Sequence, residues 1–217
     1  IGPFLLVLLL VGGVTVLVPA ARGTGAAVAL AGLGPILPFM LTSSWASFPP
    51  PGTSQKMGYL IVLSASAAWI LAPSRAQGVL RNAIVYGVAL LGTWWVSQSM
   101  LGRGEYVPGI ITTLAALAAR VGFMGQRNTA EAGALVVASG LSLGLIALLA
   151  PSASITLLGF SIAASAGGFL LWTWPKERYA VVAAGAMALV VPLIWLSTQG
   201  ALYTNANDIA LALLVAI

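Results

Sequence analysis

The sequence contains neither cysteine nor histidine, and these two absences exclude several kinds of site. Without cysteine the chain forms no disulfide and offers no thiolate to a metal, while its redox compartment is left undetermined. Without histidine it lacks the most common protein ligand of haem iron, copper, zinc and chlorophyll magnesium, and the usual proton relay near neutral pH. We therefore expect neither a bound cofactor nor a metal site.

Charged residues are also scarce, because they make up 6% of the chain while 60% of it is hydrophobic. Ordinary globular domains are roughly one quarter charged. So few charged side chains could not cover the surface of a soluble domain of 217 residues. The apolar runs are continuous, whereas a transmembrane barrel would show short alternating segments. The sequence predicts an all-α fold, a polytopic transmembrane helical bundle that forms one membrane-embedded domain over residues 1–217.

The apolar runs predict about eight membrane spans and the start of a ninth. The second span contains Pro35 and Pro38, so we expect it to be kinked or to cross only partly. Gln199–Asn207 is predicted to be a polar stretch before the ninth span, which starts near Asp208. Because the chain starts without methionine and stops inside an apolar run, we expect the native protein to be longer. The eight predicted spans are Pro3–Ala20, Gly25–Leu41, Met57–Ala72, Ala83–Leu101, Gly109–Met124, Glu131–Ala150, Ser152–Trp174 and Tyr179–Thr198.

Basic residues predict the orientation of these spans, because cytoplasmic loops carry an excess of lysine and arginine. If every span crosses, Lys56 and Arg103 lie outside with the N-terminus, and the other seven basic residues lie in the cytoplasm. A re-entrant second span would move Arg22 into the smaller set and the N-terminus inside. We favour the first alternative, in a bacterial cytoplasmic (inner) membrane. The larger set is Arg22, Arg75, Arg81, Arg120, Arg127, Lys176 and Arg178.

The charged residues indicate neither nucleic-acid binding nor catalysis. The basic residues are scattered singly between apolar runs, so the net charge of +5 gives no basic cluster for nucleic acid. The carboxylates Glu105, Glu131, Glu177 and Asp208 all fall in loops or at span ends. Glu131 and Asp208 stand where a helix N-terminus favours a negative charge. No serine-hydrolase, phosphate-loop, zinc-protease or dinucleotide motif occurs, and we predict that the protein is not an enzyme.

Small residues predict how two of the spans pack. Pro151 leaves almost no loop between the sixth and seventh spans, so these spans must form an antiparallel hairpin. Asn128 followed by Glu131 resembles a capping box at the start of the sixth span. Small residues spaced four apart let two helix backbones approach closely where lipid removes the hydrophobic drive. The predicted helix-packing residues are Gly140, Gly144, Gly159, Ala163 and Gly167.

Tryptophans near the span ends are predicted to be interfacial anchors, because their amphipathic rings prefer the headgroup level of a bilayer. Trp69 and Trp195 receive the same interpretation. Stacking on a ligand or pigment is the alternative, and the missing histidine disfavours it. The predicted anchors are Trp45, Trp94, Trp95, Trp172 and Trp174.

The polar residues within the spans are hydroxyls and an amide, with no ionisable residue at mid-span to balance a coupling ion. Hydroxyls in membrane helices usually bond to the carbonyl of the preceding turn or to a neighbouring helix. The alternative is that they line a path for an uncharged solute. The candidates for such a path are Ser64, Thr112, Thr156 and Ser161.

Two functions therefore remain open. The first is a non-catalytic membrane protein that acts as a structural or accessory subunit of a larger membrane complex. Its partners would be the lipid bilayer and other membrane subunits or further copies of itself. The second is a permease or channel-like transporter of a neutral or lipophilic small solute. Hydroxyls that converge on one wet cavity would support transport, whereas hydroxyls bonded to local carbonyls around a dry core would support the structural subunit.

Overall fold

The computed structural model describes residues 26–42, 48–50, 52–71, 78–98, 128–150, 152–173 and 183–204, together with most of residues 2–10. The regular structure in these ranges is entirely helical, which confirms the all-α part of the prediction. The predicted fifth span Gly109–Met124 and the start of the ninth lie outside the described residues. The helices are α2 (Ala26–Ala31), α3 (Ile36–Thr42), α4 (Thr53–Leu71), α5 (Gly78–Ser97), α7 (Thr129–Leu149), α8 (Ala153–Thr173) and α9 (Ala183–Tyr203).

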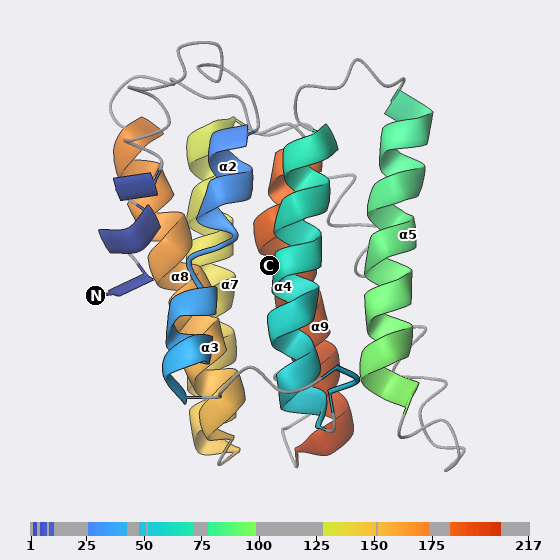
Figure 1. Ribbon diagram of the computed structural model, residues 1–217. Helices are drawn as coiled ribbons and strands as arrows, with labels where there is room; N and C mark the ends of the chain where they lie inside the picture. The colour runs from blue at the N-terminus through green and yellow to red at the C-terminus, as the bar shows by residue number, and fades with distance from the viewer. Residues whose placement is uncertain are drawn as a thin grey trace.

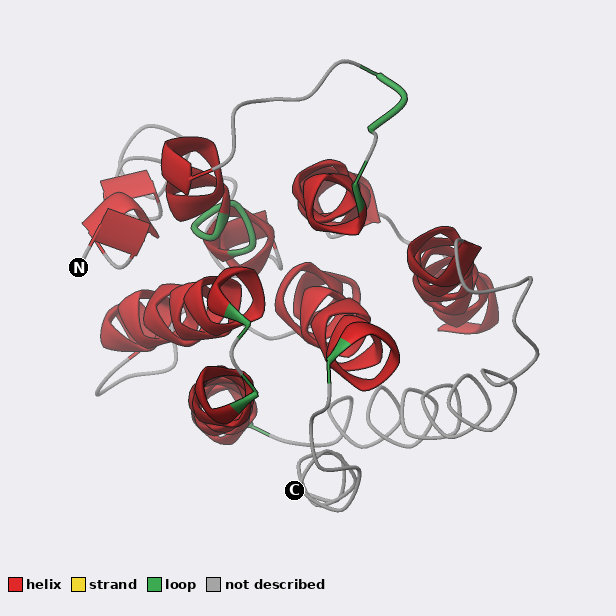
Figure 2. Ribbon diagram, turned by 90° about the horizontal axis from the view of Figure 1, so that it is seen from below, coloured by secondary structure: helices red, strands yellow, loops and turns green. Residues whose placement is uncertain are grey.

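The long helices stand side by side with their axes close to parallel, and α2 is stacked above α3 (Figure 1). Seen nearly end-on, they form a cluster rather than a single layer (Figure 2). Helix α9 is central in this cluster, because it contacts α2, α4, α5, α7 and α8. Its residues from 187 to 196 are all buried, including the fully covered ring of Trp195.

Hydrogen bonds between helices define their directions. Ser64 Oγ donates to the Met187 carbonyl at 2.9 Å, and Gln199 Nε2 lies 3.5 Å from Ser54 Oγ, so α4 and α9 are antiparallel. Trp195 Nε1 donates to the Ala89 carbonyl at 3.0 Å, and Tyr203 in the last turn of α9 donates to the Val96 carbonyl in the last turn of α5. Helices α5 and α9 are therefore parallel, as the colours of Figure 1 also show.

The predicted second span is interrupted by the turn Gly32–Pro35 between α2 and α3. In this turn the N–H groups of Gly32, Leu33 and Gly34 donate to carbonyls three residues back, at 3.0–3.1 Å. Pro35 has no N–H to continue the helical ladder. The irregularity expected from the prolines is therefore an interruption of the α-helix. The residues between α2 and α3 form a turn with the i to i−3 hydrogen bonds of a 3₁₀ helix.

Helices α4 and α9 extend beyond their predicted limits. Helix α4 starts at Thr53 rather than Met57, and Gln55 Oε1 accepts the Gly52 N–H at 3.3 Å just before its first turn. Helix α9 continues through Gln199 to Tyr203, so the predicted end of the eighth span at Thr198 was five residues too early. Gln199 is only 5% exposed, because this last turn packs against α4 and α5.

The boundaries of α7 and α8 follow the predicted hairpin closely. Asn128 Oδ1 accepts the Glu131 N–H at 2.8 Å, which caps α7 as the sequence predicts. The Ser152 N–H donates to the Ala147 carbonyl at 3.0 Å and so closes the turn into α8. By length and composition, α7 and the Ala153–Trp172 part of α8 are the two described helices able to cross a membrane.

Candidate functional site

Helices α7 and α8 approach backbone to backbone at four of the predicted small residues. A Cβ atom on Gly140 would stand 2.9 Å from the Gly159 carbonyl oxygen and 3.1 Å from Ala163 Cβ. A Cβ atom on Gly159 would stand 2.9 Å from the backbone nitrogen of Gly144. Real Cβ atoms essentially never come within 3.0 Å of such neighbours, so these distances require glycine at both positions.

Gly167, the fifth predicted packing residue, is not brought into this contact. A Cβ atom there would meet no described atom within 4 Å. Each four-residue step along a helix turns about 40° past a full turn, so Gly167 is rotated about 80° from Gly159. The small-residue ladder therefore leaves the α7–α8 interface after Ala163.

Six buried hydroxyl groups in the described helices bond to helix carbonyls. Ser161 Oγ donates to the Leu157 carbonyl at 2.6 Å, and Ser165 Oγ donates to the Ser161 carbonyl at 2.7 Å. The bond from Ser64 to α9 is the exception, because it joins two helices. A hydroxyl has a single O–H donor, and in each of these groups that donor is engaged by a backbone carbonyl. The same local bond is made by Thr93, Ser97 and Thr198.

The residues predicted to line a solute path thus have different surroundings. Ser64 connects α4 to α9, whereas Ser161 bonds within α8. Thr156 Oγ1 is buried without a hydrogen-bond partner among the described atoms. Thr112 lies outside the described residues. Of the two outcomes expected for the hydroxyls, Ser161 matches the one with a local carbonyl partner, whereas Ser64 bonds to a carbonyl of a neighbouring helix.

The predicted interfacial tryptophans differ in exposure. Trp94 is 54% exposed, whereas Trp95 and Trp172 are half-buried and pack against the core. Trp45 and Trp174 lie outside the described residues. Partial exposure near a helix end is compatible with an interfacial position, which remains a prediction.

The interfacial interpretation of Trp195 was wrong, because this side chain is fully buried between α9 and α5. A Cβ atom on Gly92 would overlap the indole ring, so the missing side chain of Gly92 leaves the space that the ring fills. The Ala89 carbonyl accepts from both Trp195 Nε1 and Thr93 Oγ1, at 3.0 and 2.9 Å. We call this arrangement the Trp195 notch.

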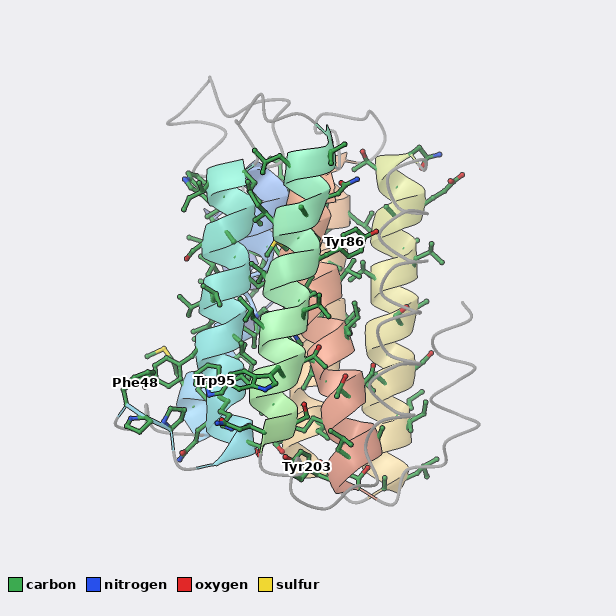
Figure 3. The ribbon with its side chains drawn as sticks, turned by 90° about the vertical axis from the view of Figure 1, so that its right-hand side faces the viewer. Phe48, Tyr86, Trp95 and Tyr203 are labelled. Atoms are coloured by element: carbon green, nitrogen blue, oxygen red, sulfur yellow. The ribbon has the colours of Figure 1, made fainter. Side chains whose placement is uncertain are left out.

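A polar cluster lies where the last turn of α5 meets α4 and α9. Lys56 Nζ donates to the Trp95 carbonyl at 2.8 Å and lies 5.9 Å from the centre of the Trp95 ring. Tyr203 Oη donates to the Val96 carbonyl at 3.0 Å. Figure 3 places Trp95 and Tyr203 at the same end of the bundle. These donors reach carbonyls in the last turn of α5, and the lysine charge is favourable at that end of the helix dipole.

Sequence reasoning missed Gln199 in this cluster. Its Oε1 atom is buried and has no hydrogen-bond partner among the described atoms. The spacing of Trp195, Gln199 and Tyr203 was an available signal, because residues four apart share a helix face and would have extended α9.

Within the described residues, no group of three or more histidine, cysteine, aspartate or glutamate side chains could hold a metal. The features described above are helix-packing contacts and hydrogen bonds from side chains to backbone carbonyls. Comparison with family models, with curated proteins and with solved structures finds no match for this chain.

Proposed function

We propose that the protein is a non-catalytic, multi-pass membrane protein that acts as a structural or accessory subunit of a larger membrane complex. The observation that carries this proposal is the use of buried hydroxyls on α4, α5, α8 and α9 as donors to helix carbonyls. Hydroxyls engaged in this way have no proton left to donate to a passing solute, and the Ser64 bond also joins α4 to α9.

Membrane insertion of the whole bundle is supported by the outer surfaces of its helices. Helices α7 and α8 contain 21 residues each, or about 31 Å, which matches the hydrocarbon thickness of a bilayer. Large apolar side chains are exposed along the outside of α4, α5 and α7, where water would oppose them and lipid would not. They include Leu63, Ile70, Leu90, Leu91, Leu141, Leu145 and Leu148.

The directions of the helices support the predicted orientation. Helix α4 ends, and α5, α7 and α9 begin, at one end of the bundle (Figure 1). In the sequence Arg75 falls between α4 and α5, Arg127 precedes α7, and Lys176 and Arg178 fall between α8 and α9. Lys56 belongs to the first turn of α4, at the opposite end. We therefore assign the arginine-rich end to the cytoplasm.

Transport of a small neutral solute is the second candidate, and the break between α2 and α3 favours it. Broken helices within a bundle are a recurring feature of transporters, where unwound backbone lines the substrate path. The break contains glycines that lie against α8 and α9, which leaves little space there in this conformation.

Purification from the native membrane in a mild detergent, with mass spectrometry of the co-eluting proteins, tests the proposal. Other membrane subunits in fixed stoichiometry would support an accessory role. A protein that elutes alone or as a homo-oligomer would contradict it. Uptake of neutral solutes into liposomes, with empty liposomes as the control, would then test the second candidate.

A further inference from the structure

Lys56, in the first turn of α4, carries a charge that has no carboxylate partner among the described residues. Its ammonium group has three N–H donors, and the one hydrogen bond described for it goes to the Trp95 carbonyl at 2.8 Å. Glu131, the carboxylate that the described residues contain, belongs to the first turn of α7 at the opposite end of the bundle (Figure 1). The ammonium group therefore keeps further donors and a positive charge that no described residue satisfies.

Aromatic side chains surround this lysine and hold its ammonium group in place. The ammonium lies 5.9 Å from the centre of the Trp95 ring, in addition to its bond with the carbonyl of the same residue. Tyr59 follows Lys56 by three residues and so lies on the same side of α4, where the Phe48 ring packs edge-on against it with centres 6.0 Å apart. Figure 3 shows Phe48 and Trp95 at the same end of the bundle. Because tryptophan and tyrosine are enriched at the headgroup level of a bilayer, this end of α4 suits that level.

Exposed leucines lie on α4 and α5, on the side of the Lys56–Trp95 contact that faces the middle of the bundle. Leu63 is seven residues beyond Lys56 in α4, on nearly the same face and about 10 Å further along the helix axis. Leu91 is four residues before Trp95 in α5, about 6 Å further in. The two leucines are 48% and 64% exposed, respectively. Since the hydrocarbon layer of one leaflet is about 15 Å thick, both fall within the leaflet whose headgroups lie at Lys56.

We infer that this end of the bundle binds one anionic phospholipid, with the lipid phosphate on the Lys56 ammonium group and an acyl chain along Leu63 and Leu91. Phosphate oxygens accept ammonium N–H groups in charge-assisted hydrogen bonds, which are stronger than neutral ones. A headgroup with a net negative charge also neutralises the lysine, which no described carboxylate does. The site needs a bilayer, so it rests on the membrane insertion proposed above, but it does not depend on whether the protein is an accessory subunit or a transporter.

Native mass spectrometry of the full chain would test the site, with phosphatidylglycerol and phosphatidylcholine supplied in equal amounts in detergent micelles. The wild-type protein should retain one phosphatidylglycerol in preference to phosphatidylcholine. Lys56→Gln should lower that retention by about tenfold or more, because a charge-assisted hydrogen bond is lost. Lys56→Arg keeps the charge and the donors, and should retain the lipid. Retention in Lys56→Gln at the wild-type level would overturn the inference.

The acyl part of the site needs its own comparison, which also tests the site if Lys56→Gln does not fold. Leu63→Ala removes apolar surface beneath the proposed acyl chain and should lower retention by about threefold. Leu141→Ala is the matched control, because Leu141 on α7 is 45% exposed and lies on a helix that forms no part of the site. Equal retention in these two variants would overturn the inference. Displacement of the lipid by an equal concentration of inorganic phosphate would also overturn it, because the site would then bind a free phosphate ion.

Carbonate extraction of native membranes separates failure of the lipid site from failure of the proposed membrane insertion. A chain that is released into the supernatant would contradict membrane insertion, and the lipid site would fail with it. A chain that stays in the membrane pellet, while Lys56→Gln retains as much phosphatidylglycerol as the wild type, would contradict the lipid site alone. Retention in the pellet together with the loss of lipid in Lys56→Gln is the result that we expect.

Discussion

The α7–α8 hairpin and the Trp195 notch both join two helices at a glycine, but they do so with opposite kinds of side chain. In the hairpin, small residues face small residues, and Gly140 and Gly159 bring two backbones together. In the notch, the largest fully buried side chain of the described residues fills the space that Gly92 leaves on α5. The hairpin joins neighbours in sequence, whereas the notch joins residues more than one hundred positions apart. Glycine therefore allows either a close backbone contact or the insertion of a large side chain, and the neighbouring helix decides which of the two occurs.

Among the substitutions that test this comparison, removal of the Trp195 indole should lower the stability of the protein most. Trp195→Ala leaves a cavity at the centre of the bundle and should lower the free energy of unfolding by about 3–5 kcal/mol. Trp195→Phe keeps one six-membered ring and should lose less, since it leaves a smaller cavity together with the unmade Nε1 bond to Ala89. Denaturant titration in mixed micelles would measure both variants. Equal losses for the two variants would mean that the ring does not fill the notch.

A large residue in the hairpin should have the next largest effect. Gly159→Leu forces α7 and α8 apart and should reduce stability by about 3 kcal/mol, near the upper end of overpacking costs. Gly167→Leu should have a much smaller effect, because the space next to Gly167 is open among the described atoms. Thermal unfolding in detergent would compare them. The hairpin contact would be disproved if Gly159→Leu unfolded at the wild-type temperature.

The pairing of Gly92 with Trp195 can be separated from their individual effects by a double-mutant cycle. Gly92→Ala alone should reduce stability by about 1–3 kcal/mol, because its methyl group overlaps a rigid ring. In a Trp195→Ala background the same substitution should cost little, since the ring is gone. Additive losses in the unfolding titration would show that the two residues do not share one space.

The smallest effects concern the hydroxyls. Ser64→Ala removes a bond between α4 and α9 and should reduce stability by about 1 kcal/mol, because a buried carbonyl loses an additional donor. Ser161→Ala removes a bond within α8 and should cost less, since the Leu157 carbonyl keeps its helical partner. Both are measured by the same titration. A larger loss for Ser161→Ala would indicate that its hydroxyl has a further role.

The hairpin was predictable because the residues that determine it lie close together in the sequence. Pro151, the GxxxG pair and the Asn128 cap lie within one stretch of sequence and fix the turn, the face and the first residue of α7. The end of α9 was not predictable in the same way. From the sequence alone Gln199 marks the start of a polar segment, because its contact with Ser54 on α4 depends on the fold.

Tryptophan illustrates the same limit. A tryptophan near the end of an apolar run is usually interfacial, and Trp94 is exposed enough to fit that interpretation. Trp195 is instead covered by a glycine on another helix, and nothing in its own neighbourhood of sequence indicates this. A kinked or partial second span was predicted from Pro35 and Pro38, but the contact of Gly32 with Ala188 depends on the packing of α9.

The central place of α9 has a consequence for how the protein is made. Helices α2, α4, α5, α7 and α8 all precede α9 in synthesis, yet each of them contacts it. Until α9 is inserted, Gly92 faces an unfilled notch and Ser64 has no carbonyl from α9 to bind. Apart from contacts such as those of the α7–α8 hairpin, which the earlier helices make without α9, the bundle can close only after residues 183–203 have been synthesised.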